Sequence, residues 1–270
     1  MGETLVRPMT RHDTSDPTGA AAVGDDEVVQ HLLDTDPEGC WVAEDGGRIV
    51  GTVASSRREL TRVLSSWHVV PEHRRRGLGT QLLAAALHHG RGCLRGLTVV
   101  PDRPEAARML RRAGLDLHPL LQLTGVVDRT GLEPGSRVRE GGAGDRDLLD
   151  SVARRTRSAA HGPDHAWLLE RHRLLVSERT TGEGFCYVDR AGVPVLLAAT
   201  SRRTAVDLMH EALASSPEGT EVHLDNLTAA NAWAVDVGLA AGLDLHPGPG
   251  YLGLRGARLP APYLHHAVVL

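Results

Sequence analysis

A seven-residue sequence occurs twice in this chain and restricts its fold more than any other feature. The segment Ala113–Pro119 reads Ala-Gly-Leu-Asp-Leu-His-Pro, and the same residues recur at Ala241–Pro247. Each copy follows a segment with helical periodicity, at Glu105–Arg112 and Ala230–Leu239, and precedes an apolar strand-like segment. The glycine shortly after each helix, at positions 114 and 242, is a common helix C-terminal signal. The sequence therefore predicts a duplicated α/β unit.

The correspondence between the copies extends backward with one interruption. The apolar positions of a predicted helix at Gln81–Leu87 match those of a helix at Ala205–Ala214, and Cys40–Val42 matches Cys186–Val188. Between hairpin and helix, however, the second copy is shorter by the length of one strand and one loop. We therefore expect the second copy to lack the strand and the loop that precede the central helix of the first.

A segment without apolar periodicity separates the copies. Asp128–Ser136 is rich in turn-forming residues, which is typical of a linker. We expect one domain at residues 1–128, a linker at 129–136 and a second domain at 137–270. In the second domain the pattern predicts a strand at Val138, helices at Asp145–Ser158 and His165–Val176, a hairpin at Gly184–Ala199, and a strand at Glu221–Leu224.

The first copy contains a basic, glycine-containing loop between a strand and a helix. Val63–Val70 reads as a buried strand, and the helix at Gln81–Leu87 follows the run from Arg74 to Gly79. Glycine at positions 77 and 79 lets the main chain approach a ligand closely, and the first N–H groups of the helix point at that place. Because the helix dipole and three consecutive arginines favour an anion, the sequence predicts a pyrophosphate-binding loop.

Two other classes of phosphate-binding protein do not fit. The P-loop signature Gly-x-x-x-x-Gly-Lys-Ser/Thr does not occur, and all thirty basic residues are arginine. A dinucleotide fold requires Gly-x-Gly-x-x-Gly directly after its first strand, and this motif is absent. The sequence thus argues against nucleotide triphosphatases and nicotinamide-dependent enzymes.

Composition indicates the compartment and the partners. The formal net charge of −4 gives no general attraction to nucleic acid or to anionic lipid. The chain has no apolar run long enough to cross a bilayer, and Met1–Thr4 lacks the core of a signal peptide. We expect a cytoplasmic protein that contacts neither nucleic acid nor membrane, and the sequence leaves a homodimer open.

Cysteine and histidine give no indication of a disulfide or a metal site. Cys40, Cys93 and Cys186 are odd in number and widely spaced, so we expect buried thiols. The pairs His88-His89 and His265-His266 have no acidic or cysteine residues at metal-ligand spacing. We expect these histidines at the surface or at helix ends, and no bound metal.

The pattern Arg74-x-x-Gly77-x-Gly79, with Val69-x-Pro71 before it, resembles the acyl-CoA signature of the GNAT superfamily of N-acyltransferases. The family also has a hairpin where Cys40–Ala54 predicts one. The resemblance implies an α/β (α+β) fold made of two tandem GNAT-like domains, each a mixed, largely antiparallel sheet flanked by helices. The second domain would be degenerate and without a phosphate loop.

The resemblance implies acetyl-CoA as cosubstrate and a small amine as acceptor. The acetyl group would move from acetyl-CoA to a primary amine by direct attack of the amine on the thioester. A non-catalytic acyl-CoA-binding or scaffold protein on the same fold is the alternative. The residues expected to contact acetyl-CoA are Val69, Val70, Arg74, Arg75, Arg76, Gly77, Leu78, Gly79 and Thr80.

The family's acid and base are not found at their usual positions. The general base of the family falls on Val63 and Ser65 here, and His68 lies on the opposite face of the strand unless a bulge intervenes. The family's tyrosine falls on Leu110, and all three tyrosines of the chain lie in its second half. The catalytic candidates are therefore Ser65, His68, Tyr251 and Tyr263. The polar segment at 10–26 is expected to be a lid near the acceptor or a disordered loop.

Overall fold

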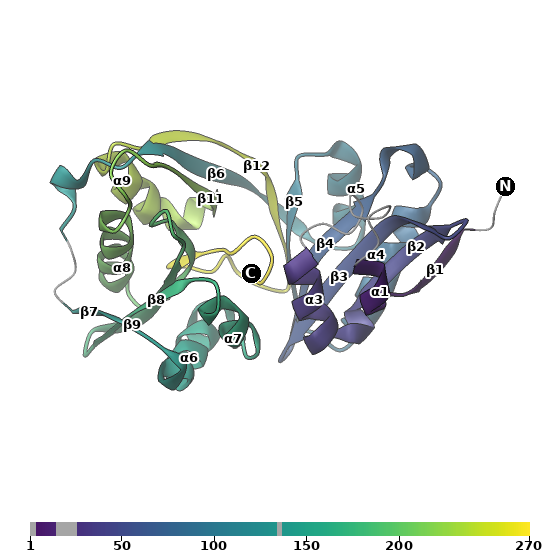
Figure 1. Ribbon diagram of the computed structural model, residues 1–270, viewed down its shortest axis with the longest axis horizontal. Helices are drawn as coiled ribbons and strands as arrows, with labels where there is room; N and C mark the ends of the chain where they lie inside the picture. The colour runs from purple at the N-terminus through teal and green to yellow at the C-terminus, as the bar shows by residue number, and fades with distance from the viewer. Residues whose placement is uncertain (1–3, 15–25, 134–136) are drawn as a thin grey trace. The chain divides into compact units, whose positions relative to one another are not determined.

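The computed structural model describes residues 4–14, 26–133 and 137–270 of the chain (Figure 1). It contains two compact units, Met1–Thr98 and Val99–Leu270, and each is described by itself. Apart from the short helix α1 (Arg11–Thr14), most of the predicted lid segment lies outside the described residues. Among the residues that are described, every helix is too short or too polar to span a lipid bilayer.

The first unit is a sheet with helices packed against it. The strands follow the order β1-β2-β3-β4-β5, and all neighbours are antiparallel except β4 and β5, which are parallel. The strands are β1 (Leu5–Pro8), β2 (Cys40–Asp45), β3 (Arg48–Arg58), β4 (Thr61–Val69) and β5 (Arg95–Pro101). The longer helices are α3 (Asp26–Thr35) and α4 (Leu78–His89).

Local sequence explains the central hairpin and helix of this unit. The predicted hairpin is confirmed as β2 and β3, and its turn residues Gly46 and Gly47 both have positive φ, 58° and 81°. This is the geometry of the tight turn that suits the twist of paired strands. Helix α4 has its buried side chains at Leu78, Leu82, Leu83 and Ala86, a spacing that lines one helix face toward the sheet.

The second unit begins in the last residues of β5 and contains two sets of strands (Figure 1). One set is antiparallel in the order β13-β10-β9-β8-β7, and in the other β6 pairs with both β12 and β11. The strands are β6 (Asp116–Val126), β7 (Val138–Glu140), β8 (Arg173–Arg179), β9 (Gly182–Val188), β10 (Pro194–Ala199), β11 (Glu221–Leu227), β12 (Asp244–Arg255) and β13 (Tyr263–Leu264). The helices are α5 (Pro104–Arg112), α6 (Arg146–Arg157), α7 (Asp164–Leu169), α8 (Arg202–Ala214) and α9 (Ala232–Ala240).

Two cores fill the two faces of the five-stranded sheet. Alternate residues of a strand point to opposite faces. Accordingly Phe185 and Tyr187 enter one core, with α6 and α7, while Cys186 and Val188 enter the other, with α8 and α9. The same alternation divides Leu174 from its neighbour Leu175, so β8 is apolar at successive positions.

The continuous apolar run in β8 explains a wrong helix prediction. Residues His165–Val176 do not form one helix, because α7 ends at Leu169 and β8 begins at Arg173. A strand buried on both faces has no alternation of apolar and polar residues, so periodicity cannot distinguish it from a buried helix. Two histidine expectations also need revision: His265 is buried, at 3% exposure, rather than at the surface, and His266 is only partly exposed.

The expected loss of a strand from the second copy is also wrong. Four antiparallel strands precede α8, just as four precede α4. What is shorter is the connection from the fourth strand to the helix, since β10 ends at Ala199 and α8 begins at Arg202. The sequence match of Cys40 to Cys186 therefore pairs β2 with β9, whereas element order pairs β3 with β9.

The two strands that contain the seven-residue repeat, β6 and β12, pair with each other, although the repeated residues do not lie opposite one another. In the ladder between β6 and β12, Asp116 lies opposite Leu254 and Thr124 lies opposite Asp244. Because β6 pairs with β12 and β11, residues 99–128 belong to the second compact unit rather than to the first. The compact units therefore divide the chain earlier than the expected boundary at residue 128.

Candidate functional site

The connection between β4 and α4 contains the predicted anion-binding loop. Its first residue, Val70, donates its N–H to Val50 O at 2.9 Å and so extends the pairing of β4 with β3 by one more hydrogen bond. A short 3-10 turn, Pro71–His73, follows. Arg75 and Gly77 then have φ of 60° and 84°, and Gly77 caps α4 in the left-handed conformation. This sharp turn directs the first N–H groups of the helix at the loop.

The loop is basic and exposed. Arg74 to Arg76 are exposed, and only Arg74 is oriented by a contact to the main chain, from its Nε to Val69 O at 2.9 Å. His73 Nε2 lies 2.9 Å from Asp45 Oδ2, which ties the 3-10 turn to the β2–β3 hairpin. Thr80 and Gln81 both donate to Gly77 O at 3.1 Å, so helical bonding begins there. The N–H groups before Thr80 therefore have no acceptor within their own helix.

The surroundings of the two glycines differ. A Cβ on Gly77 would meet no atom within 4 Å, so the left-handed backbone rather than lack of space requires glycine. A Cβ on Gly79 would lie 3.4 Å from Trp67 Cζ2, and Trp67 Nε1 donates to Gly79 O at 3.1 Å. Trp67 thus connects β4 to the first turn of α4. Sequence reasoning missed this residue, although a tryptophan shortly before the loop was the available signal.

The parallel pairing of β4 with β5 ends several residues before the loop. The parallel ladder with β5 covers Thr61–Leu64 against Arg95–Thr98, whereas β4 itself continues to Val69. The hydroxyl oxygens of Ser65 and Ser66 are buried and have no hydrogen-bond partner among the described residues. Two buried hydroxyl groups therefore lie in β4 directly after the end of its parallel ladder with β5.

A bulge in β4 changes the face on which His68 lies. Ala54 pairs with Ser66 and Ser55 pairs with Leu64, so Ser65 is the extra residue. Without the bulge, His68 and Val63 would lie on opposite faces of the strand. With it, their partners Thr52 and Ser56 have the same parity along β3, so both side chains lie on one face.

The other face of β4 is the one covered by α4. A Cβ on Gly51, opposite Val69, would lie 3.2 Å from Val69 Cγ2 and 3.1 Å from Leu82 Cδ1 of α4. Trp67 also contacts α4, as described above. His68 therefore lies on the face away from α4, together with Val63, the position at which the resemblance expected a general base.

The two tyrosine candidates lie in different environments of the second unit. Tyr251, on β12, donates its hydroxyl to Asp102 Oδ1 at 3.0 Å, and this hydrogen bond raises the pKa of the phenol. Tyr263, on β13, is fully buried, and its oxygen lies 2.9 Å from His161 Nε2. Burial raises the pKa of Tyr263 above its usual range. Of the two, only Tyr251 is open to solvent.

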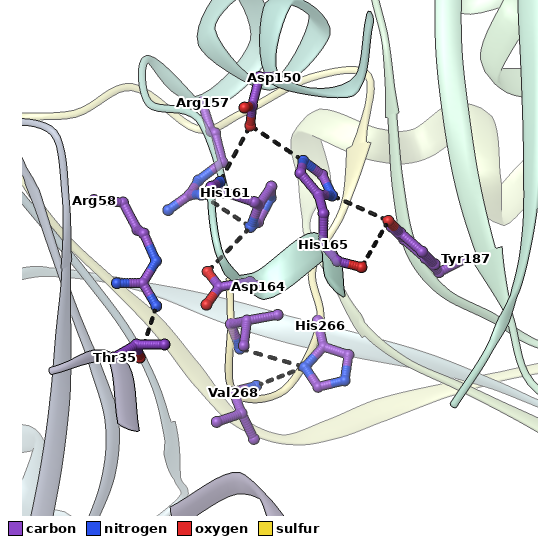
Figure 2. A network of polar contacts seen from close by, with 12 residues as sticks. Thr35, Arg58, Asp150, Arg157, His161, Asp164, His165, Tyr187, His266 and Val268 are labelled. Atoms are coloured by element: carbon purple, nitrogen blue, oxygen red, sulfur yellow. Dashed lines mark hydrogen bonds and ion pairs between the residues drawn. The ribbon is translucent and has the colours of Figure 1, made fainter. Parts of the chain in front are cut away.

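Tyr263 lies beside a buried polar cluster that sequence reasoning did not find. Figure 2 shows this cluster, which is formed by Asp150, Arg157, His161, Asp164, His165 and Tyr187. Arg157 has only donors, so His161 Nδ1, 3.1 Å from its NH1, must accept. His161 Nε2 then carries the proton and donates to Tyr263, and burial lowers the pKa of His161. The cluster is a neutral-histidine network in the interior of the second unit.

No cluster of histidine, cysteine or carboxylate side chains suited to a metal ion occurs within the described ranges. Cys40 and Cys186 are buried, as expected, while Cys93 is partly exposed, and all three are free thiols.

Comparison with known proteins identifies the fold. The sequence model of the acetyltransferase (GNAT) family matches residues 7–115, and no curated protein matches the sequence significantly. The structure is similar to a proposed acetyltransferase from Pyrococcus horikoshii, with 16% identity, a TM-score of 0.77, and coverage of 98% of this chain and 95% of that one. It is also similar to a tandem GNAT protein from the clavulanic acid biosynthesis pathway, with 14% identity, a TM-score of 0.56, and coverage of 95% and 99%.

A third similar structure is a GCN5-related N-acetyltransferase from Sphaerobacter thermophilus, with 13% identity, a TM-score of 0.55, and coverage of 94% of this chain and 96% of that one. At these identities the similarity shows the fold. The predicted resemblance and fold class are confirmed: the chain has a tandem GNAT fold with mixed, largely antiparallel sheets flanked by helices, and the family match lies in its first part.

Proposed function

Because residues 7–115 match the acetyltransferase (GNAT) family and the chain has a tandem GNAT fold, we propose that it is an acetyl-CoA-dependent N-acetyltransferase acting on the primary amine of a small molecule. The family and fold support acyl transfer from acetyl-CoA in general. The observation that carries the proposal is the loop at Arg74–Thr80, with its left-handed Gly77 and exposed arginines, which follows the part of β4 that extends beyond its ladder with β5.

The residues of the loop fit the phosphates of acetyl-CoA. The first-turn N–H groups of α4 and the exposed guanidinium groups of Arg75 and Arg76 would hold the pyrophosphate. The open space beside Gly77 leaves room for it. Val69 and Val70 would present main-chain groups to the pantetheine arm along the edge that β5 leaves. When bound, acetyl-CoA supplies a thioester activated toward attack by an amine.

We propose His68 as the residue that takes a proton from the acceptor. Because of the bulge at Ser65, His68 lies on the same face of β4 as Val63. This face points away from α4, the helix that follows the proposed phosphate-binding loop. An imidazole can accept the proton of an ammonium group near neutral pH, whereas a serine cannot. Most of the remaining rate would come from orienting the amine against the thioester.

Turnover against a panel of small amines tests the proposed activity, with thiol release from acetyl-CoA as the readout. Release that depends on one class of amine supports the transferase. Tight binding of acetyl-CoA without release against the whole panel would instead support the non-catalytic acyl-CoA-binding or scaffold protein.

The variant His68→Asn tests the proposed base. Because general base catalysis contributes roughly 100-fold or more, we expect kcat to fall by about that factor while acetyl-CoA affinity stays unchanged. The pH profile of kcat should lose the limb that reports deprotonation of the base. His88→Asn makes the same change near the end of α4 and should leave both properties unaltered. A wild-type kcat and pH profile for His68→Asn would rule the role out.

A further inference from the structure

The two units have the same order of elements up to their fourth strand and the helix after it. The first has β1 to β4, then α4 and β5, and the second has β7 to β10, then α8 and β11. Strand β10 therefore corresponds to β4, and β11 corresponds to β5. In the first unit β4 pairs with β5 in parallel over Thr61–Leu64 and then continues to Val69 paired with β3.

The corresponding edge of β10 is occupied by the end of the chain. Tyr263 pairs with Ala198 and Leu264 pairs with Leu197, antiparallel, and Ala199 N donates to Pro262 O at 3.2 Å. Strand β11, the counterpart of β5, pairs with β6 instead of with β10. The segment Pro260–His265, which we call the tail strand, thus lies against β10 where the acyl-CoA arm is proposed to lie against β4.

The tail strand contributes to both cores of the second unit. Leu264 packs in the core with α8 and α9, and Tyr263 packs in the opposite core with Phe185 and Tyr187. Both residues are almost entirely inaccessible to solvent, with exposed fractions of 1% and 0%. Farther along, Val268 and Val269 donate their N–H groups to His266 Nδ1, which turns the chain back (Figure 2).

The side chain of Asn231, at the start of α9, binds the main chain of the tail strand. Its Oδ1 accepts from Tyr263 N at 2.9 Å, and its Nδ2 donates to Pro260 O at 3.1 Å. Asn231 is completely buried, and Thr228 Oγ1 and Trp233 Nε1 complete its hydrogen bonds. A side-chain amide that donates to one peptide group and accepts from another recognises an extended main chain rather than a particular side chain.

We propose that the second unit is a binding site for an extended peptide, that its ligand is the tail strand of the same chain, and that this occupancy excludes acyl-CoA from the second unit. The inference rests on the proposed function for the position of the acyl-CoA arm. The short connection from β10 to α8 gives a second, independent reason, since it leaves no room for a phosphate loop.

Hydrogen exchange of the intact chain, measured with and without saturating acetyl-CoA, tests the proposal. We expect the amides of Tyr263 and Leu264 to exchange as slowly as those of β9, with less than a twofold change when acetyl-CoA is added. Calorimetry should give one acetyl-CoA per chain. Fast exchange of the tail strand, its deprotection by acetyl-CoA, or a second equivalent of acetyl-CoA would overturn the proposal. Absence of any acetyl-CoA binding would instead contradict the proposed function. In that case the exchange rates of Tyr263 and Leu264 alone would decide whether the tail strand occupies its site.

A pair of variants tests the role of Asn231. Asn231→Ala removes both bonds to the tail strand, and we expect exchange at Tyr263 to accelerate at least tenfold while acetyl-CoA affinity in the first unit is unchanged. Trp233→Phe removes a hydrogen bond to the same oxygen but leaves both bonds from Asn231 to the tail strand, so exchange at Tyr263 should change less than threefold. Equal effects of the two variants on the tail strand would show that Asn231 only stabilises α9. If Asn231→Ala unfolds the unit, the wild-type exchange and the stoichiometry still decide the proposal.

Discussion

Two features of position 77 favour glycine. Its backbone is left-handed, and it lies where a phosphate is proposed to bind. We expect Gly77→Asp to weaken acetyl-CoA affinity at least about 100-fold, because the carboxylate would face the phosphates as well as strain the turn. Gly92→Asp is a matched control. Gly92 has φ 85°, close to the 84° of Gly77, and a Cβ there also meets nothing within 4 Å, but it follows the other end of α4.

Calorimetric titration with acetyl-CoA separates the two contributions to the Gly77 effect. Both variants should lose similar stability from backbone strain, on the order of 1 kcal/mol. Only Gly77→Asp should lose affinity. An unchanged dissociation constant for Gly77→Asp would disprove the assignment of the loop.

At the scale of elements, the helices and strands around the buried polar cluster make the second unit sensitive to acid. Burial lowers the pKa of His165 to about 4 and of His265 to about 3. Between the unfolded pKa of about 6.5 and these values, the unfolded chain binds protons that the folded chain does not. Stability is therefore complete above pH 6.5 and falls as the pH is lowered through this window, by roughly 3 kcal/mol for the shift of His165 and roughly 5 kcal/mol for that of His265.

Thermal midpoints measured at pH 7.5, 6, 5 and 4 check this dependence. His265 is the informative position, because neither ring nitrogen has a partner among the described residues. His265→Leu should keep the buried volume and reduce the loss of stability between pH 6.5 and 4. The same slope in the variant and the wild type would show that His265 does not supply it.

On the scale of the whole molecule, the pairing of β6 with β12 and β11 decides whether the first copy can exist alone. A fragment of residues 1–128 would keep β6 but lose both of its partner strands. Strand edges without partners promote association between chains. We expect the fragment to elute as aggregate in size-exclusion chromatography, whereas the full chain does not. A monomeric fragment that binds acetyl-CoA with full affinity would show that the pairing of β6 with β11 and β12 is dispensable.

Local sequence determined the elements whose chemistry is local. The turn at Gly46-Gly47, the loop ending in Gly77 and the buried face of α4 all follow from residue types at fixed spacing, so they could be predicted. The tandem fold was also predictable, because the repeat at Ala113 and Ala241 is visible in the sequence and the comparisons confirm the fold. The residues that bind acetyl-CoA and the catalytic base stay predictions.

Tertiary structure alone decided which strands pair, since pairing joins residues far apart in the chain. The sequence showed that the repeats are alike but not that β6 and β12 pair with each other. It gave no sign that Ser65 forms a bulge, which places His68 with Val63, because a bulge depends on the register with β3. Nor did it show that Asn231 binds the backbone of residues 260 and 263, because those bonds form only once the chain end lies against β10.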